Sequence, residues 1–355
     1  MDKPTALQAL SDVSAYVAPI PNSADASACL ASVASFIESQ SDIAAIAPPS
    51  PPVITTAMRD LTSSGQIKFI SAATASPIRD VWADQSLVAL KFTAPRDVPM
   101  LIEDIKVDSC RELIGCEGGS PAINNVTVRR CDAKVGKRGI YIRYNNANWL
   151  VEDVNLTSRL INKETGVIPM GVQIADTAHD LIFRRVVCEN FITDWTGTDR
   201  ANDYWNADGF VAERGNYNIL FEDCVARNCT DGGFDFKATN TRLERCLAEG
   251  CARSYRFWTN NHHGQITSRN PIKRGGSGGV RHVGIYGSVT ELIIDHFIAE
   301  ADTPLAPLFV NESAAPDPVL ILGKHDFRVP AGTPMFGANA RPLKVIDPQG
   351  NPISL

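Results

Sequence analysis

Short strand-like segments recur through the middle of this 355-residue chain, and this repetition constrains the fold more than any other feature. One repeated element reads glycine, apolar, any residue, apolar. A second element, between its copies, alternates apolar and other residues, and its starts lie about 23 to 38 residues apart. One coil of a solenoid takes roughly the shorter spacing, and loops account for the excess. The first element begins at Gly139, Gly171, Gly209 and Gly233, with weaker copies at Ser254 and Gly284.

The alternation in these segments has a period of two, so each segment buries one side and exposes the other. No helical periodicity interrupts the repeats, which argues against the crossover helices of a βαβ sheet. We therefore predict an all-β fold, a right-handed parallel β-helix, in which stacked coils pair their strand edges and share one core. A β-sandwich or propeller is the alternative, but the Asn-Gly and Asp-Gly hairpin turns typical of those folds are scarce.

The segments that flank the repeats have a different composition. Residues 24–46 are rich in Ala and Ser, carry apolar residues at helical spacing, and end at a Pro-rich stretch. We expect residues 1–52 to form a helical lead-in and linker that cap the stack, because an open solenoid end exposes its core. Residues 53–302 are then the β-helix, and the Pro-rich residues 303–355 a C-terminal cap.

Composition narrows the classes of function. The net charge is −6 and no long basic run occurs, so we expect no nucleic-acid partner. No apolar stretch is long enough for a membrane span, and we expect a monomer with no membrane partner. The first 20 residues lack the basic and apolar regions of a signal peptide, so the chain is either intracellular or a mature exported form. A secreted or periplasmic location is expected, with a cytoplasmic one as the alternative.

The chain has 9 cysteines, an odd number without a Cys-x-x-Cys motif, and most lie in apolar segments. Cys224 and Cys246 are 22 residues apart, as are Cys229 and Cys251. This spacing predicts small buried side chains stacked on successive coils, rather than disulfides or a zinc site.

If the copies of the first element stack in register, their third residues form one outward line. Two aromatic rings, an amide, an acid and a base along such a line suit a sugar-binding surface, because rings stack on sugar faces and polar groups bind hydroxyls. A solvated face without a ligand is the alternative. The line reads Tyr141, Gln173, Val211, Asp235, Arg256 and Tyr286. Of these, Tyr141 and Gln173 are predicted to bind substrate.

Three acids should converge near the middle of the stack. Asp208 and Asp231 are 23 residues apart, about one coil, and Asp235 follows on the next strand. Converging carboxylates repel each other unless a cation lies between them, and Ca²⁺ prefers such oxygen ligands. Each acid alone also fits the common Asp-Gly turn, but that explains poorly why the turn recurs before two consecutive strands.

Asn206-Ala207-Asp208-Gly209-Phe210, followed one coil later by Asp231 to Asp235, resembles the paired motif of polysaccharide lyase family nine. That family consists of parallel β-helix pectate lyases and their relatives, and the match covers about residues 206–258. The resemblance implies calcium ligands at Asp208, Asp231 and Asp235. The family usually has a further acid at the place of Gly232, so this site has one ligand fewer, which Glu213 or water would have to replace.

The resemblance also implies a base. The family uses a lysine on the strand of the following coil, and Arg256 stands at that position here. Because a guanidinium has a reference pKa above about 12, Arg256 either needs an unusual environment or acts as a clamp on the substrate carboxylate. In the second case Lys237, Arg253, Tyr255 or a histidine takes the proton. The predicted catalytic residues are Arg256 and Lys237, with Arg253 and Tyr255 as substrate contacts.

Two segments after this strand complete the candidate site. His262 lies on a loop beside His263, where it is either a substrate contact or part of an ordinary polar loop. Lys273 belongs to a basic, glycine-rich loop that can close over an acidic sugar chain. Both residues are predicted to bind substrate.

The residues favour a lyase that cleaves a uronate-containing polysaccharide by calcium-assisted β-elimination. The first alternative is a β-helix glycoside hydrolase that uses a pair of these aspartates. The second is a carbohydrate-binding solenoid without catalysis, in which the aspartates hold a structural ion. The sequence does not identify the polysaccharide.

Overall fold

The computed structural model describes residues 68–70, 88–92, 94–116, 122–158, 168–338 and 340–354. The chain divides into two compact units, Met1–Val53 and Ile54–Leu355. The helical lead-in predicted within residues 1–52 lies outside the described residues.

The described residues form one 21-stranded sheet in which the strands pair in parallel. They contain no helix, and therefore none long and apolar enough to cross a membrane. The strands of the N-terminal half are β1 (Lys68–Ile70), β2 (Val88–Phe92), β3 (Met100–Glu103), β4 (Lys106–Cys116), β5 (Val126–Ile142), β6 (Ala147–Ser158), β7 (Met170–Ile174), β8 (His179–Glu189), β9 (Asp208–Ala212) and β10 (Tyr217–Glu222). The remaining strands are β11 (Val225–Arg227), β12 (Gly232–Phe236), β13 (Thr239–Glu244), β14 (Cys246–Glu249), β15 (Arg253–Phe257), β16 (His262–Arg269), β17 (Arg281–Ile285), β18 (Glu291–Glu300), β19 (Phe309–Asn311), β20 (Val319–Arg328) and β21 (Lys344–Ile346).

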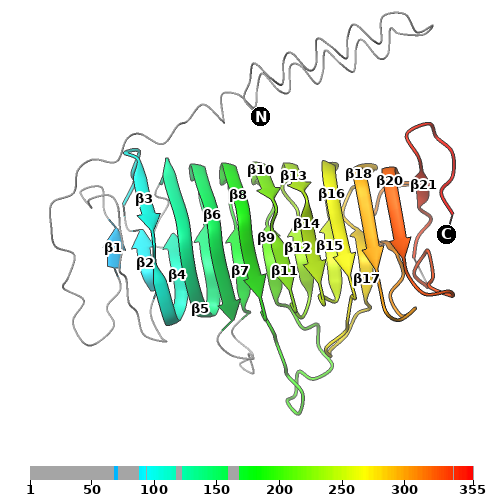
Figure 1. Cartoon of the computed structure of the whole chain (residues 1–355), viewed down its shortest axis with the longest axis horizontal. Helices are drawn as coiled ribbons and strands as arrows, with labels where there is room; N and C mark the ends of the chain where they lie inside the picture. The colour runs from blue at the N-terminus through cyan, green and yellow to red at the C-terminus, as the bar shows by residue number, and fades with distance from the viewer. Residues whose placement is uncertain are drawn as a thin grey trace, which may run out of the picture. The chain divides into compact units, whose positions relative to one another are not determined.

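Strands from successive coils stack into three ladders, side by side along the second unit (Figure 1). The long strand β5 shows how one coil supplies all three. Its Ile140 pairs with Val172 of β7 in the first ladder, Val126 with Trp149 of β6 in the second, and Ala133 with Leu156 of β6 in the third. The first ladder continues through β9, β12, β15, β17 and β19.

This arrangement agrees with the coil predicted from the repeats. Phe210, Phe234 and Tyr255 occupy the same position on consecutive coils, and their stacked rings lie 4.8 and 5.3 Å apart, centroid to centroid. All three rings are buried in one continuous core. Because every coil places an apolar side chain at the same depth, a segment too short to fold alone is stabilised by its neighbours.

The cysteines are buried as predicted. Those of the described residues are free thiols in the interior, and Cys246 donates to the carbonyl oxygen of Phe221, one coil earlier, at 3.3 Å. Burial raises the pKa of the Cys188, Cys229 and Cys246 thiols well above its ordinary value. These side chains therefore behave as small core residues.

Two buried side chains replace backbone partners where β13 and β16 lie side by side. The Nδ1 atom of His263 accepts from the amide of Leu243 at 3.2 Å, and the amide oxygen of Asn261 accepts from the amide of Thr241 at 3.0 Å. Burial lowers the pKa of His263 to about 3, so its ring is neutral and can accept.

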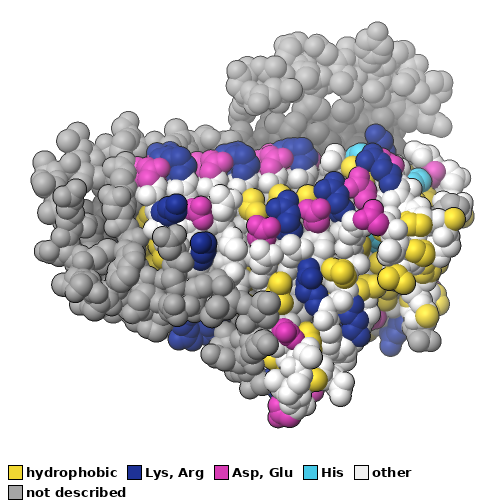
Figure 2. Space-filling model, turned by 60° about the horizontal axis from the view of Figure 1, so that its bottom comes forward, with side chains coloured by type: hydrophobic (Ala, Val, Ile, Leu, Met, Phe, Trp, Pro, Cys, Tyr) yellow, Lys and Arg dark blue, Asp and Glu magenta, His cyan; other side chains and the backbone are white. Residues whose placement is uncertain are grey.

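The turns between the second and third ladders carry a column of exposed charges that alternate in sign from coil to coil (Figure 2). The residues adopt positive φ angles of 51 to 56°. Ion pairs of 2.6 to 2.8 Å join them in twos across adjacent coils. We call this set the charge column. Its members are Asp104, Arg130, Asp153, Arg185, Asp223 and Arg245.

The stack does not end at residue 302, where a C-terminal cap was predicted to begin. Strand β19 pairs with β17, β20 pairs with β18 along its whole length, and β21 pairs with β20. The Pro-rich composition after Thr303 reflects long turns between these strands rather than the end of the repeat.

Candidate functional site

The outward face of the first ladder carries the predicted line of side chains, here called the middle line. The strand register places Tyr141, Gln173, Val211, Asp235 and Arg256 opposite one another on five consecutive coils. The sequence prediction of this line is therefore confirmed as far as Arg256.

Tyr286 does not belong to the middle line, which corrects the prediction. The residue in register with Arg256 is Gly284, because β17 begins at Arg281, two residues earlier than the repeat pattern indicates. The Tyr286 ring nevertheless reaches this place. A Cβ atom on Gly284 would lie 2.6 Å from Cε2 of Tyr286, so only glycine leaves room for the ring.

Three acids meet on the coils of β9 and β12, as the spacing predicts. Asp208 begins β9, Asp231 immediately precedes β12, and Asp235 lies in β12. All three are at most 2% exposed. The amide of Gly232 donates to Oδ1 of Asp208 at 2.7 Å, which ties the two coils together at this point.

Two guanidinium groups from the next coil lie among the acids. Arg253 contacts Asp231 through Nη1, and Nη1 of Arg256 lies 3.0 Å from Oδ2 of Asp231 and 2.9 Å from Oδ2 of Asp235. The other oxygen of Asp235 accepts from the indole of Trp258 at 2.6 Å. Acidic and basic side chains thus alternate in this cluster, and the carboxylates already accept hydrogen bonds from neighbouring groups of the chain.

The charges in this cluster affect one another strongly. Burial raises the pKa of Asp208 well above its ordinary value, and the neighbouring Asp231 and Asp235 raise it further. Burial alone would lower the pKa of Arg256, but the carboxylates of Asp231 and Asp235 outweigh it, and that pKa is raised. Asp208 therefore tends to hold its proton, whereas Arg256 keeps its positive charge.

Two loops at one end of the first-ladder strands approach this cluster. They connect β8 to β9 and β16 to β17, and both project from the same edge of the stack (Figure 1). They meet where the amide of Ser277 donates to the carbonyl oxygen of Asp203 at 2.8 Å. From the first loop, the hydroxyl of Tyr204 contacts Asp231 and accepts from Arg253 at 3.1 Å. Tyr204 is 38% exposed and covers an otherwise buried group of charges.

The carboxylates, as arranged, do not fit the predicted calcium site. Oδ1 of Asp208 accepts from a backbone amide, and both oxygens of Asp231 and of Asp235 accept from arginine, tyrosine or tryptophan donors. A calcium ion would have to displace these donors to gain its six to eight oxygen ligands. Among the described residues, no group of three or more acids, cysteines or histidines is arranged to hold a metal.

A further line of side chains follows the middle line at the end of each first-ladder strand, and we call it the end line. Backbone hydrogen bonds place Glu213, Lys237, Trp258 and Tyr286 on four consecutive coils. The rings of Trp258 and Tyr286 stack with centroids 4.6 Å apart. Both oxygens of Glu213 accept from Nζ of Lys237, at 2.9 and 2.8 Å, and Nζ also lies 3.4 Å from Asp235.

Cations surround the partly exposed ring of Trp258. The guanidinium carbons of Arg214 and Arg256 lie 5.4 and 5.5 Å from its centroid, and Nζ of Lys237 lies 5.7 Å away. Neither Trp258 nor Tyr204 was predicted from the sequence as a site residue. Trp258 was detectable, because it directly follows the apolar-x-apolar triplet of its coil, but Tyr204 reaches the cluster through a loop whose course the repeats do not indicate.

Three other predicted substrate contacts, Tyr141, Gln173 and Lys273, differ in their position and in how far they are exposed. Tyr141 is on the middle line, but it is 6% exposed beneath the guanidinium of Arg138, 4.0 Å from the ring centroid. Gln173 is half-buried beside it in register. Lys273 is exposed on the loop between β16 and β17, with Arg274 next to it.

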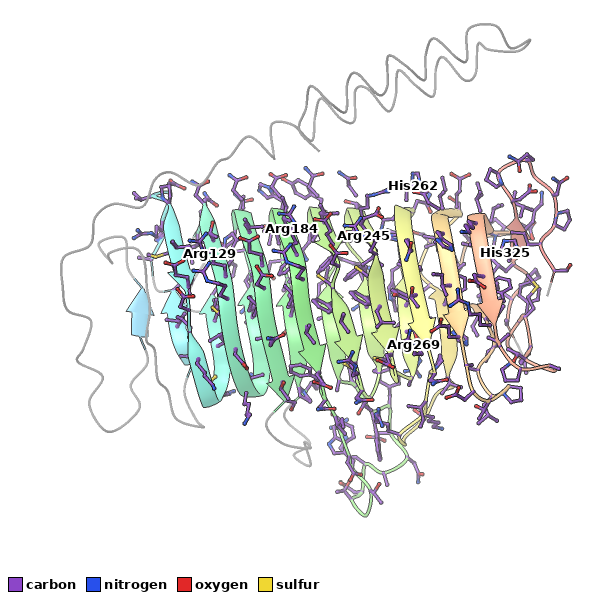
Figure 3. The ribbon with its side chains drawn as sticks, in the orientation of Figure 1. Arg129, Arg184, Arg245, His262, Arg269 and His325 are labelled. Atoms are coloured by element: carbon purple, nitrogen blue, oxygen red, sulfur yellow. The ribbon has the colours of Figure 1, made fainter. Side chains whose placement is uncertain are left out.

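Two residues predicted as substrate contacts, Tyr255 and His262, lie away from the candidate site. Tyr255 is fully buried, and its hydroxyl donates into the core, to the carbonyl oxygen of Thr267 at 2.8 Å, so no substrate can reach it. His262 begins β16, pairs with Asp295 at 2.5 Å, and stands at the edge of the stack opposite the two loops (Figure 3). Because β16 begins at His262, this residue belongs to the second ladder and not to the face that carries Arg256.

No family model matches this chain, and no curated protein or solved structure matches it either.

Proposed function

We propose that this chain is a right-handed parallel β-helix polysaccharide lyase that cleaves a uronate-containing polysaccharide by β-elimination. The observation that carries the proposal is the set of cations around Trp258, formed by Arg214, Lys237 and Arg256. The exposed part of the indole can contact a sugar ring, and the cations over the indole attract a carboxylate on that sugar. The likeness of residues 206–235 to the motif of polysaccharide lyase family nine supports the same reaction.

The chemistry explains why cations are needed. The C5 proton of a uronate is acidic because the neighbouring carboxylate can take up the charge left behind when the proton departs. Positive groups near that carboxylate stabilise the developing enediolate. Arg256 suits this clamp role better than the role of base, because its pKa is raised by Asp231 and Asp235. Lys237 also retains its proton, since Asp235 and Glu213 raise its pKa despite burial.

Calcium assistance stays a prediction. The acids that would bind the ion accept hydrogen bonds from donors of this chain, so in the proposed reaction the positive charge beside the substrate carboxylate comes from Arg256 and Arg214. For a polysaccharide substrate we also propose a secreted or periplasmic location and a monomeric state.

The glycoside hydrolase alternative has less support. It needs two carboxyl groups on either side of an accessible glycosidic bond. Asp208 has the raised pKa of a general acid, but Asp208 and Asp231 are 1% and 0% exposed, beneath Tyr204 and Arg253. A non-catalytic sugar-binding solenoid would use the same Trp258 surface.

The test is a panel of acidic polysaccharides incubated with the full chain, with and without EDTA. A lyase generates a 4,5-unsaturated uronate that absorbs in the near ultraviolet, and we expect this product to form in EDTA. Trp258→Ala should raise KM at least tenfold, whereas Tyr217→Ala, which removes an exposed aromatic ring from the second ladder, should not.

Other outcomes would contradict parts of the proposal. New reducing ends without absorbance would identify a hydrolase, and binding without either product would identify a binding solenoid. Activity that EDTA abolishes and calcium restores would mean that the ion displaces the arginine donors, and the cation clamp would then be wrong.

A further inference from the structure

The proposed elimination needs a base, and the base must meet three structural requirements. It has to be a proton acceptor, it has to be reachable from solvent, and it has to lie beside the cations that hold the substrate carboxylate. This inference rests on the proposed function, because it asks which residue of the same face removes the C5 proton.

The predicted bases fail the first requirement. Arg256 lies between two carboxylates, and Lys237 lies between Glu213 and Asp235, so each cation is held in its charged form by its neighbours. Neither has a lone pair to accept a proton while these contacts persist.

The histidines fail the third requirement. His282 and His263 are buried in the core, where they bond to Ser268 and to the amide of Leu243. His179, His262, His296 and His325 lie in strands of the second and third ladders. All six histidines of the sequence are thereby placed away from the first-ladder face.

The buried acids fail the second requirement. Asp208 is 1% exposed and Asp231 is 0% exposed. The side chain of Asp235 is 3% exposed, its oxygens accept from Trp258 and Arg256, and Nζ of Lys237 lies 3.4 Å from one of them. None of the three can turn an oxygen toward a sugar without breaking the cluster.

Glu213 meets all three requirements. It lies on the end line, next to Lys237 and one coil before it, and its side chain is 35% exposed. Both oxygens of its carboxylate accept from Nζ of Lys237, at 2.9 and 2.8 Å. Lys237 links it to Asp235 at 3.4 Å, and Asp235 in turn holds Arg256 at 2.9 Å. Three contacts, through Lys237 and Asp235, therefore connect the accessible carboxylate to the guanidinium clamp.

We infer that Glu213 is the catalytic base, and that Lys237 is a positioning residue that aims its carboxylate at the sugar bound on Trp258. Glu213 takes the proton from C5, the C4–C5 double bond forms, and the bond from C4 to the glycosidic oxygen breaks. The departing oxygen takes a proton from water, and Glu213 releases its own proton to solvent. The reaction needs no oxidant or metal, and carboxylate bases abstract protons next to carbonyl carbon in other enzymes.

The arrangement explains why a lysine stands at position 237. Its ammonium holds both oxygens of Glu213, which limits the orientations of a long side chain. The residue itself keeps its proton throughout, so it acts through Glu213 rather than on the reacting atoms.

The experiment uses the full chain and the polysaccharide on which the wild type forms unsaturated product. Glu213→Gln should lower kcat by about 100- to 10,000-fold, the range for loss of a general base, with KM nearly unchanged. In D₂O it should also lose exchange of the C5 proton of recovered substrate. Glu213→Asp should restore part of the activity. The control, Glu249→Gln, makes the same change at a half-buried glutamate of the third ladder that pairs with Arg227.

Lys237→Met and Lys237→Arg test the positioning role. We expect Lys237→Met to lower kcat more than it raises KM, and Lys237→Arg to recover part of the loss, because a guanidinium can also pair with Glu213. A pH profile of kcat/KM whose acidic limb disappears in Glu213→Gln but persists in Lys237→Met would support the assignment.

Failure of the proposed function and failure of the Glu213 assignment would give different results. If the wild type yields no unsaturated product from any polysaccharide, the proposed function fails and this inference fails with it. If the wild type is active but Glu213→Gln, with an unchanged unfolding midpoint, keeps C5 exchange and kcat within threefold, the proposed function stands and Glu213 is not the base.

Discussion

The backbone amide of Gly232 donates a 2.7 Å hydrogen bond to Oδ1 of Asp208 on the preceding coil. This contact occupies the place where the resembled family carries another acid. A Cβ atom on Gly232 would lie 2.7 Å from that same oxygen and 3.4 Å from Cβ of Asp235. Any side chain at position 232 therefore has to push Asp208 out of its buried position.

We predict that Gly232→Ala destabilises the fold by about 1 to 3 kcal/mol, the usual cost of forcing extra atoms into a packed site. Urea unfolding followed by circular dichroism measures the change. Gly279→Ala is the control, because the nearest atom to its added methyl, Nη2 of Arg281, lies 3.8 Å away. Equal stability of the two variants would mean that Asp208 can move freely.

Arg256 should be more important for stability than an exposed arginine. Replacing it by methionine leaves Asp231 and Asp235 as neighbouring buried carboxylates without their shared donor, and breaking a buried pair costs about 3 to 5 kcal/mol. The double variant Arg256→Met with Asp235→Asn removes one of the stranded charges. We expect it to recover part of the lost stability, and a loss that is simply additive in a double-mutant cycle would contradict the coupling.

The buried histidine His263 should make stability depend on pH. In the folded chain its pKa is lowered to about 3, compared with 6.5 in an unfolded chain. Below pH 6.5 the unfolded state therefore binds a proton that the folded state does not, so stability falls by up to about 1.4 kcal/mol per pH unit until the pH nears 3. Above pH 6.5 this contribution is constant.

Unfolding free energies at pH 7, 6 and 5 check this expectation. His263→Gln should show a shallower loss on acidification than the wild type, because glutamine can still accept from the amide of Leu243 but does not titrate. His325→Gln, at an exposed position, is the control and should follow the wild-type curve. Parallel curves for wild type and His263→Gln would contradict the assigned pKa.

The sequence predicted most of what depends on the repeat. The middle line follows directly from the spacing of the glycine elements, and Asp231 lies one residue from the position opposite Asp208 because their separation is close to one coil. The error at Tyr286 arose because β17 starts two residues earlier than its weak repeat copy indicates. Tyr255 stands at the second, inward position of its repeat copy, as Phe210 and Phe234 do, so the period-two alternation itself indicates burial, and its selection as a substrate contact did not follow that pattern.

The contents of the cluster were harder to predict. The acids can be recognised in the sequence as motifs. That Arg253 and Arg256 form ion pairs with them depends on the direction in which the side chains of the next coil point. Tyr204 comes from a loop of variable length, for which the repeat sets no register. Glu213 was visible only as a substitute ligand, because its pairing with Lys237 requires the backbone register of two coils.

The charge column offers a last prediction, about how neighbouring coils recognise each other. Arg185 of the charge column pairs with Asp153 at 2.6 Å. Arg185→Glu places like charges beside each other on adjacent coils. We expect a loss of about 1 kcal/mol, because exposed pairs contribute little individually, and we expect this loss to shrink in 1 M salt. Arg185→Glu combined with Asp153→Arg should regain part of the stability, since the pair is then restored with its order reversed but now places like charges next to Arg130 and Asp223. A loss that salt does not change, or that the reversed pair does not repair, would mean that the arginine stabilises the turn through its aliphatic stem rather than through its charge.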